Sequence, residues 1–372
     1  MLHASNPAKI FPRLAELCRR IKLLKRDQLR KVRVKSIVTP ETVALQIERN
    51  DQTGTALARP TRHCDSLSVD HSRTAAMDLS TLPTELIHAI SRHLELCDHL
   101  LLCRTNSRMH TICVEWIYRV LNFKSPVQLL RCCKAIISRP EAAVSVWSLK
   151  IDCCPSYAFR SFHTMVRSAT MRMKNLRVIC VPSSSNLFRS LSDLIFPQLI
   201  ESTIPLSMDS YSFLRRNPTV ERASFLDPFG SDDSQSFPND FSHIQPIHMP
   251  KLRHLEGPEI AARTIVPGAP VSELVISWWW DSNPVMEYSR GLIAAASSKA
   301  ELYSLINLIV RWDPTLLYAI AKHTPQIGYL QIWGPRYLTD SSREDFLFAV
   351  DNILPSLTSL KTIIVSPHPP SA

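Results

Sequence analysis

Several histidine, cysteine and carboxylate side chains in this sequence are of types that perform chemistry. A histidine stands next to a cysteine at His63-Cys64, and two further histidines, His243 and His248, lie five residues apart. Zinc sites need three or four such ligands at short spacings, and these residues lack the partners. The pair Asp232-Asp233 lies in a polar segment, which indicates a solvated loop rather than an acid–base pair. We therefore predict no catalytic residue, no metal site and no cofactor.

Glycine-dependent motifs are also missing from the sequence. The chain has only seven glycines, and the patterns GxGxxG, GxSxG, HExxH and the phosphate-binding Walker loop do not occur. The sequence therefore favours a binding function, with no small-molecule substrate, over catalysis.

Aromatic side chains in the C-terminal half are the candidates for binding. Trp278, Trp279 and Trp280 follow an apolar stretch, and in an extended chain Trp278 and Trp280 share one face. Exposed aromatic residues are frequent hot spots of protein interfaces. Two interpretations stay open: two of the three belong to the core, or the triplet is part of a substrate-binding patch. That patch would contain Trp278, Trp279, Trp280, Trp312, Trp333 and Tyr337.

The segment 79–121 is predicted to form three short helices. In the first, Pro83 suits the first helical position, and apolar residues recur every fourth residue, which places them on one face: Leu86, Ile90 and Leu94. The second begins after Asp98, an acceptable N-cap, and the third extends over 107–121. Because three short helices hide fewer aliphatic side chains than this segment carries, the segment is expected to have a partner.

These residues resemble the F-box, the motif by which a substrate receptor docks on the Skp1 adaptor of a cullin–RING ubiquitin ligase. One departure is His88, where the family usually has an aliphatic or small residue, and the alternative is an ordinary helical bundle. The matching positions are Leu82, Pro83, Glu85, Leu86, Ile90, Leu94, Asp98, Leu100, Cys103, Arg104, Asn106, Arg108, Met109, Trp116, Tyr118 and Arg119. The resemblance implies that Skp1 is contacted by Leu82, Pro83, Leu86, Ile90, Leu94, Leu100, Leu101, Met109 and Trp116.

The resemblance implies a non-catalytic substrate-recognition subunit of an SCF-type ubiquitin ligase. Such a protein binds a Skp1-type adaptor, and through it a cullin, and raises the local concentration of a protein target near the ubiquitin-loaded enzyme. Two alternatives are a Skp1-binding scaffold outside a ligase and a membrane or nucleic-acid binder that uses the N-terminal region. The expected location is the cytoplasm, the nucleus or both.

Positive charge is concentrated in residues 1–76, which hold 15 Lys or Arg and 7 Asp or Glu, while the whole chain has a net charge of +10. An amphipathic helix is predicted over about 8–36, followed by a flexible linker over 50–76. The helix is interpreted as solvated or coiled-coil, as a contact to acidic membrane or nucleic acid, or as a mitochondrial presequence. Met77 directly precedes the F-box-like segment, so the natural start could lie there.

The rest of the chain alternates aliphatic strands with helices and predicts an α/β fold. The segments resemble the degenerate leucine-rich repeats that follow the F-box in many fungal proteins, although no repeat has the full phrase LxxLxLxxN. The alternative is a compact α/β domain with a parallel sheet. Strands are expected at 146–151, 176–181, 199–204, 220–225, 252–255, 274–277, 305–310, 327–332 and 360–365, and helices at 127–138, 209–215, 314–322 and 341–354.

The predicted organisation is therefore a basic, partly disordered extension (1–76), an F-box (77–122), a linker helix (123–145) and an irregular leucine-rich-repeat-like solenoid (146–372) that binds substrate. The polar segment 229–246 is predicted to be a surface loop of the solenoid. Ten cysteines without a signal peptide are expected to be reduced, and no apolar run is long enough to predict a transmembrane helix.

Overall fold

The computed structural model describes residues 82–153, 159–181, 185–226, 245–278, 284–335 and 340–367. The predictions for the N-terminal helix 8–36 and the linker 50–76 lie outside these ranges. So do Trp279, Trp280, Tyr337 and most of the loop 229–246.

The strands form one parallel sheet of ten strands, and each strand pairs with the next one in the chain. Because parallel neighbours cannot be joined by a tight turn, the chain must cross back over the sheet before each new strand. The strands are β1 (Val120–Phe123), β2 (Ser148–Ile151), β3 (Val178–Cys180), β4 (Glu201–Pro205), β5 (Arg222–Leu226), β6 (His254–Pro258), β7 (Glu273–Trp278), β8 (Ser304–Ile309), β9 (Tyr329–Gly334) and β10 (Thr362–Pro367).

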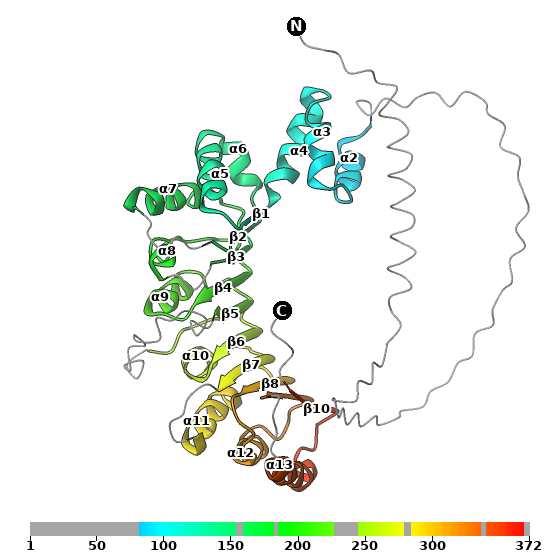
Figure 1. The fold of residues 1–372 in the computed structure, drawn as a ribbon, viewed down its shortest axis with the longest axis vertical. Coiled ribbons are helices and arrows are strands. Elements are labelled where there is room, and N and C mark those ends of the chain that lie inside the picture. The colour runs from blue at the N-terminus through cyan, green and yellow to red at the C-terminus, as the bar shows by residue number, and fades with distance from the viewer. Residues whose placement is uncertain are drawn as a thin grey trace, which may run out of the picture.

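Helices α5 to α13 cover one side of the curved sheet (Figure 1). The three N-terminal helices α2–α4, which we call the hairpin, lie at the β1 end of the sheet. No helix in the described ranges is long and apolar enough to cross a membrane. The helices are α2 (Thr84–Ser91), α3 (Leu96–Leu102), α4 (Ser107–Arg119), α5 (Pro126–Ser138), α6 (Pro140–Ser145), α7 (Arg160–Thr170), α8 (Ser185–Arg189), α9 (Met208–Arg216), α10 (Glu259–Ile265), α11 (Pro284–Ala296), α12 (Pro314–His323) and α13 (Asp340–Ile353).

A continuous buried row, apolar except for Ser202, crosses the middle of the sheet and faces the helices. Its members lie side by side in the strand register, and none is more than 8% exposed: Leu121, Leu149, Ile179, Ser202, Ala223, Leu255, Leu274, Leu305, Leu330 and Ile363. A second row is also buried, and each of its members precedes a residue of the first row by three positions in the sequence. Its members are Val146, Leu176, Leu199, Val220, Leu252, Val271, Leu302 and Ile327. Together with the helices these rows form one hydrophobic core.

All nine strands expected from the sequence are present as β2 to β10, and the four helices expected after residue 123 are present as α5, α9, α12 and α13. The predicted end of the third helix at Leu121 is wrong. The helix ends at Arg119, and Val120–Phe123 forms β1, because its backbone pairs with Ser148–Ile151. Pairing in the sheet overrides the local helical pattern here.

Residues 123–145, expected to be a linker helix, contain two helices, α5 and α6. Leu129, Cys133 and Ile136 of α5 belong to the same core as the strands. This segment therefore covers the sheet in the same way as the helices of the later units.

Close packing between units depends on a glycine beneath an aromatic ring. At the end of β9, a Cβ atom on Gly334 would lie 2.6 Å from ring atoms of Trp312. That ring is fixed, because its Nε1–H donates to the Pro335 carbonyl at 3.1 Å and its edge packs on Phe346 at a centroid distance of 5.0 Å. The site therefore has no room for a side chain.

We predict that Gly334→Ala lowers the free energy of unfolding by about 1–3 kcal/mol, the usual cost of overpacking a fixed core contact. The measurement is urea unfolding followed by circular dichroism. Gly328→Ala is the matched control: its Cβ would meet the Tyr303 ring at 2.8 Å, but Tyr303 is 54% exposed and can rotate away. Equal unfolding midpoints for Gly334→Ala and the native chain would contradict the prediction.

Candidate docking and binding surfaces

The hairpin α2–α4 has a small core of its own, separate from that of the sheet. Ile87, Met109 and Ile112 are buried in it, with Leu82, Leu102 and Trp116 packed around them. Two polar contacts fix its ends: the Arg108 guanidinium donates to the Leu82 carbonyl at 2.7 Å, and the Asn106 side chain accepts from the Met109 N–H at 2.8 Å. So small a core leaves much of the hairpin's apolar surface uncovered.

Two predicted details of the hairpin are wrong. Pro83 is the N-cap of α2 and not its first residue, since the helix begins at Thr84. The N-cap of α3 is Glu95, and Asp98 is its third residue, where the carboxylate accepts from the Glu95 N–H at 3.4 Å. Asp98 thus stabilises the start of the helix from inside it, as in a capping box.

The exposed apolar side chains of the hairpin gather on α2 and α3. Leu86 is 51% exposed, Leu96 59%, Leu100 51% and Leu101 56%. Sequence reasoning missed Leu96, although its four-residue spacing from Leu100 puts both on one face of α3. Large aliphatic side chains grouped in this way on a surface mark an interaction site.

The nine residues predicted to contact an adaptor differ in accessibility. Pro83, Leu86, Leu100 and Leu101 are exposed, and Leu82, Ile90, Leu94 and Trp116 are partly exposed. Met109 is only 2% exposed and fills the hairpin core, so it holds the helices together and does not lie on the surface.

His88, the departure from the F-box pattern, lies in a ring cluster inside the hairpin. The Trp116 Nε1–H donates to His88 Nδ1 at 3.1 Å, and the His99 ring lies parallel to Trp116 at 6.2 Å between centroids. His99 Nε2 lies 3.1 Å from the Ser91 carbonyl, so this nitrogen carries a proton and donates there. Burial lowers the pKa of His99 below its ordinary value.

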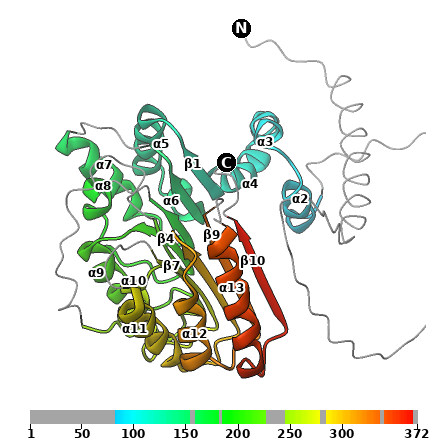
Figure 2. The same ribbon diagram turned by 60° about the horizontal axis from the view of Figure 1, so that its bottom comes forward.

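No helix of the described residues covers the side of the sheet opposite α5–α13 (Figures 1 and 2), and we call it the open side. The side chains on its two halves differ in kind. From β4 to β7 it carries polar cross-strand pairs: an ion pair of Glu201 with Arg222 at 2.7 Å and a contact of His254 Nδ1 with Glu273 Oε2 at 3.2 Å.

From β7 to β10 it carries apolar side chains that are mostly partly exposed: Val275 pairs with Ile306 and Leu308 with Trp333, while Gln331 separates Ile306 from Ile364. We call this second set the apolar half: Val275, Ile306, Leu308, Trp333 and Ile364.

The aromatic residues predicted to form one patch do not come together where the structure describes them. Trp278 is 5% exposed, packs on the helix side and donates from Nε1 to Asn307 Oδ1 at 2.9 Å. Trp312 lies over Gly334 on the same side. Only Trp333 of these three lies on the open side, at the register position of Leu308 and Ser366.

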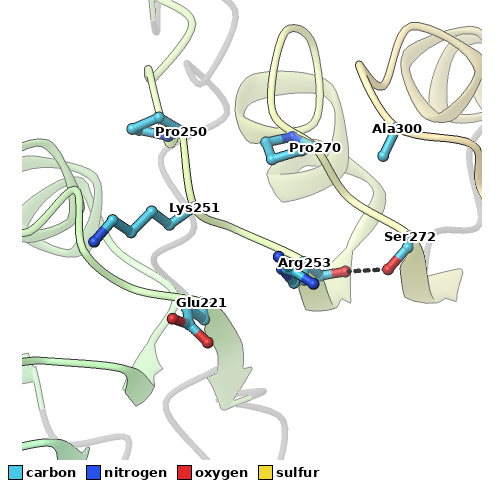
Figure 3. Close-up of a pocket in the computed structure, with 7 residues that line it drawn as sticks. All are labelled: Glu221, Pro250, Lys251, Arg253, Pro270, Ser272 and Ala300. Carbon is cyan, nitrogen blue, oxygen red and sulfur yellow. Dashed lines mark hydrogen bonds between the residues drawn. The ribbon is translucent and has the colours of Figure 1, made fainter.

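A surface hollow of about 550 Å³ lies where strands β5 to β8 begin. Figure 3 shows Lys251 and Glu221 at one end, Arg253 in the middle, and the Ser272 hydroxyl, which donates to the Arg253 carbonyl at 3.4 Å. Prolines 250 and 270 and Ala300 complete the lining. The hollow carries both signs of charge and no nucleophile beside a general base, so its chemistry is that of a polar contact surface.

In the described ranges, no three histidine, cysteine or carboxylate side chains come together in a possible metal site. Burial raises the pKa of Cys132 to about 11 and of Cys133 to about 12. Thiols with such pKa values are poor nucleophiles at neutral pH.

No family model matches the chain, and a search of curated proteins finds no significant similarity. The case for function therefore depends on the residues themselves.

We predict that the stability of the hairpin falls as the pH falls below about 6.5, the ordinary histidine pKa. The folded state holds His99 neutral, so its stabilising contribution is complete above the unfolded pKa and is lost as pH decreases toward the lower folded pKa. Urea unfolding at several pH values between 7.5 and 5 measures the effect.

His99→Gln removes the titrating ring and should flatten this pH dependence relative to the native chain. His93→Gln, which changes an exposed histidine on the loop after α2, is the matched control. Parallel profiles for the native chain and His99→Gln would refute the role of His99.

Proposed function

We propose that this protein is a substrate receptor that docks on a Skp1-type adaptor of a cullin–RING ubiquitin ligase through an F-box formed by α2–α4. The observation that carries the proposal is the group of exposed leucines on α2 and α3, on a hairpin whose own hydrophobic cluster, among the described residues, is built on Ile87, Met109 and Ile112. The Leu82-Pro83 start and the order of three short helices support the same assignment.

The region after the hairpin is proposed to be an irregular leucine-rich-repeat-like solenoid. Its support is a repeated set of three buried positions with spacings of three and two residues, as in Val146, Leu149 and Ile151 or in Ile327, Leu330 and Ile332. The strictly sequential order of the parallel strands also favours a repeat architecture, in which each unit packs only on its neighbours.

The open side of the sheet is proposed to hold the protein target. The apolar half offers aliphatic side chains around Trp333, and interfaces of this kind concentrate binding energy in a central aromatic residue. No side chain of the receptor performs a reaction in this scheme. It holds the target beside an enzyme that carries ubiquitin, and proximity supplies the rate enhancement.

We predict that the full chain co-purifies with a co-expressed Skp1 homologue and that Leu100→Asp/Leu101→Asp weakens this binding at least about 100-fold. Two buried carboxylates in an apolar interface cost several kcal/mol. Both side chains are more than half exposed in the free chain, so the substitutions should leave folding unchanged.

Val127→Asp is the control for the pull-down. Val127 is equally exposed, at 56%, but it lies on α5 beyond the hairpin. Full binding by this variant, together with loss of binding by the double variant, is the expected pattern. Failure of the native chain to bind any Skp1 homologue tested would refute the proposal.

A second prediction separates docking from target recognition. Proteins that co-purify with the full chain are tested in a reconstituted ubiquitylation reaction with adaptor, cullin and RING subunits. A protein that is ubiquitylated only when the full chain is present is taken as the target. Ile306→Lys, on the apolar half of the open side, should lose the target yet keep the adaptor. Leu100→Asp/Leu101→Asp should keep the target yet lose its ubiquitylation.

Ile293→Lys serves as the matched control in that reaction, because Ile293 is 53% exposed and lies on α11 in the helix layer. Equal ubiquitylation with Ile306→Lys and with Ile293→Lys would show that the target does not use the apolar half.

A further inference from the structure

The last unit of the sheet is less well covered than the units before it. In the β10 unit, Leu360 and Val365 are both partly exposed. Their equivalents, which lie three residues before and two residues after each member of the first buried row, are buried in every unit from β2 to β9. Because a unit of a solenoid is covered by the unit that follows it, the β10 unit needs a covering element that the described part of the chain does not supply.

The backbone of β10 has a partner strand on one side. β10 is the last strand in the order of the sheet and, within the described ranges, it pairs with β9 alone. The Thr362 N–H points to that side, where it donates to the Gly328 carbonyl at 3.3 Å. Since successive residues of a strand direct their backbone groups to opposite sides, Ile363 and Val365 direct theirs away from β9.

The sequence of β10 does not protect this edge. The strand reads Thr-Ile-Ile-Val-Ser-Pro, so it has no charged residue, and four of its six residues before the proline ring closes the strand are β-branched or small. Exposed edges of this kind pair readily with another strand, and proteins usually cover them or place a charge on them. The edge of β10 is therefore suited to receive a further strand.

A segment outside the described residues has the sequence pattern of such a strand. Residues 41–48 read Glu-Thr-Val-Ala-Leu-Gln-Ile-Glu, in which Val43, Leu45 and Ile47 alternate with polar or small residues. Strict alternation predicts a strand with one buried face. The segment lies between the helix predicted over 8–36 and the linker predicted over 50–76, so it conflicts with neither.

We propose that residues 41–48 form an additional strand that pairs with the outer side of β10. Val43, Leu45 and Ile47 then extend the buried rows and cover Leu360 and Val365. The polar residues of the segment continue the open side of the sheet.

Charge also favours this pairing. Lys361, directly before β10, is exposed, and no carboxylate of the described residues forms an ion pair with it. The segment begins at Glu41 and ends at Glu48. A carboxylate therefore lies at the end of the added strand that is close to Lys361, whether the strand runs parallel or antiparallel to β10.

The connecting chain is long enough to reach the edge. The linking residues 49–81 number 33 and end at Leu82, where the described part of the chain begins. Nine strand spacings separate β1 from β10, or about 43 Å at about 4.8 Å each. A flexible chain of this length has a root-mean-square span of roughly 30 Å and an extended limit of roughly 110 Å.

A second copy of the chain fits the same edge less well. Two β10 strands can pair about a twofold axis, which brings helix α13 of one copy beside α13 of the other. Asp345 and Asp351 are exposed on α13, so this arrangement brings like charges together.

The test is hydrogen–deuterium exchange of the full chain, at a concentration where sedimentation shows a monomer. Residues 42–48 and the outward amides of Ile363 and Val365 should both exchange slowly, because each set is hydrogen-bonded to the other. Leu45→Pro removes a donor and a buried side chain from the added strand. It should accelerate exchange at Ile363 and Val365 at least about tenfold.

Leu57→Pro is the matched control, because it makes the same substitution in the linker and should leave exchange at β10 unchanged. If circular dichroism shows that Leu45→Pro is unfolded, Leu45→Asp decides, since it keeps the backbone donor and should still accelerate exchange at β10. Fast exchange of residues 42–48 in the native monomer, or unchanged exchange at Ile363 and Val365 in the folded variant, would overturn the proposal. Protection of β10 that appears only in a dimer would overturn it as well, in favour of a second copy.

Discussion

The chain must enter every strand at the same end of the sheet, because the strands are parallel and follow one another in chain order. The returning segments pack on one side, as Figure 1 shows, and bury the apolar rows of the strands. No helix of the part of the chain that the structure describes covers the opposite side. The same constraint aligns the residues that precede the strands, so that Arg119, Trp147 and Arg177 become neighbours although each is about one unit from the next.

The hairpin depends on that constraint as well. Helix α4 ends at Arg119 and β1 begins at the next residue, so no free linker separates the hairpin from the sheet. Arg119 lies against Trp116 of the hairpin and Trp147 of the sheet at once. Contacts of this kind hold the exposed leucines of α2 and α3 in a set direction relative to the open side. A receptor that must place a target near an enzyme benefits from such a fixed geometry.

Periodicity in the sequence was sufficient to predict the repeated parts of the fold. The aliphatic residues of β2 to β10 come in short runs bounded by proline and polar residues, and all nine strands were found. β1 was missed because Val120 and Leu121 also continue the apolar stripe of α4, and only their pairing with Ser148 and Leu149 makes them a strand. The local sequence pattern cannot predict pairing with a strand that lies almost thirty residues further along the chain, as Ser148 does from Val120.

The surfaces were harder to predict than the fold. The aliphatic content of residues 79–121 correctly indicated uncovered leucines, but spacing alone did not tell Met109, which is buried, from Leu96, which is exposed. Trp278 and Trp333 look equivalent in the sequence, yet their positions in the strands send one to the helix side and the other to the open side. The stacking of Arg119 and Arg177 on Trp147 gave no signal in the sequence, because these residues become neighbours only when successive units are aligned.

The most direct test of the account is hydrogen–deuterium exchange of the full chain with and without a Skp1 homologue. Exchange reports which backbone amides become protected when the adaptor covers them. The account predicts protection in α2 and α3, over Thr84–Ser91 and Leu96–Leu102, and no change in α11–α13. Unchanged exchange in α2 and α3 at saturating adaptor, or protection confined to the sheet and its helices, would contradict the proposal that the hairpin is the docking element.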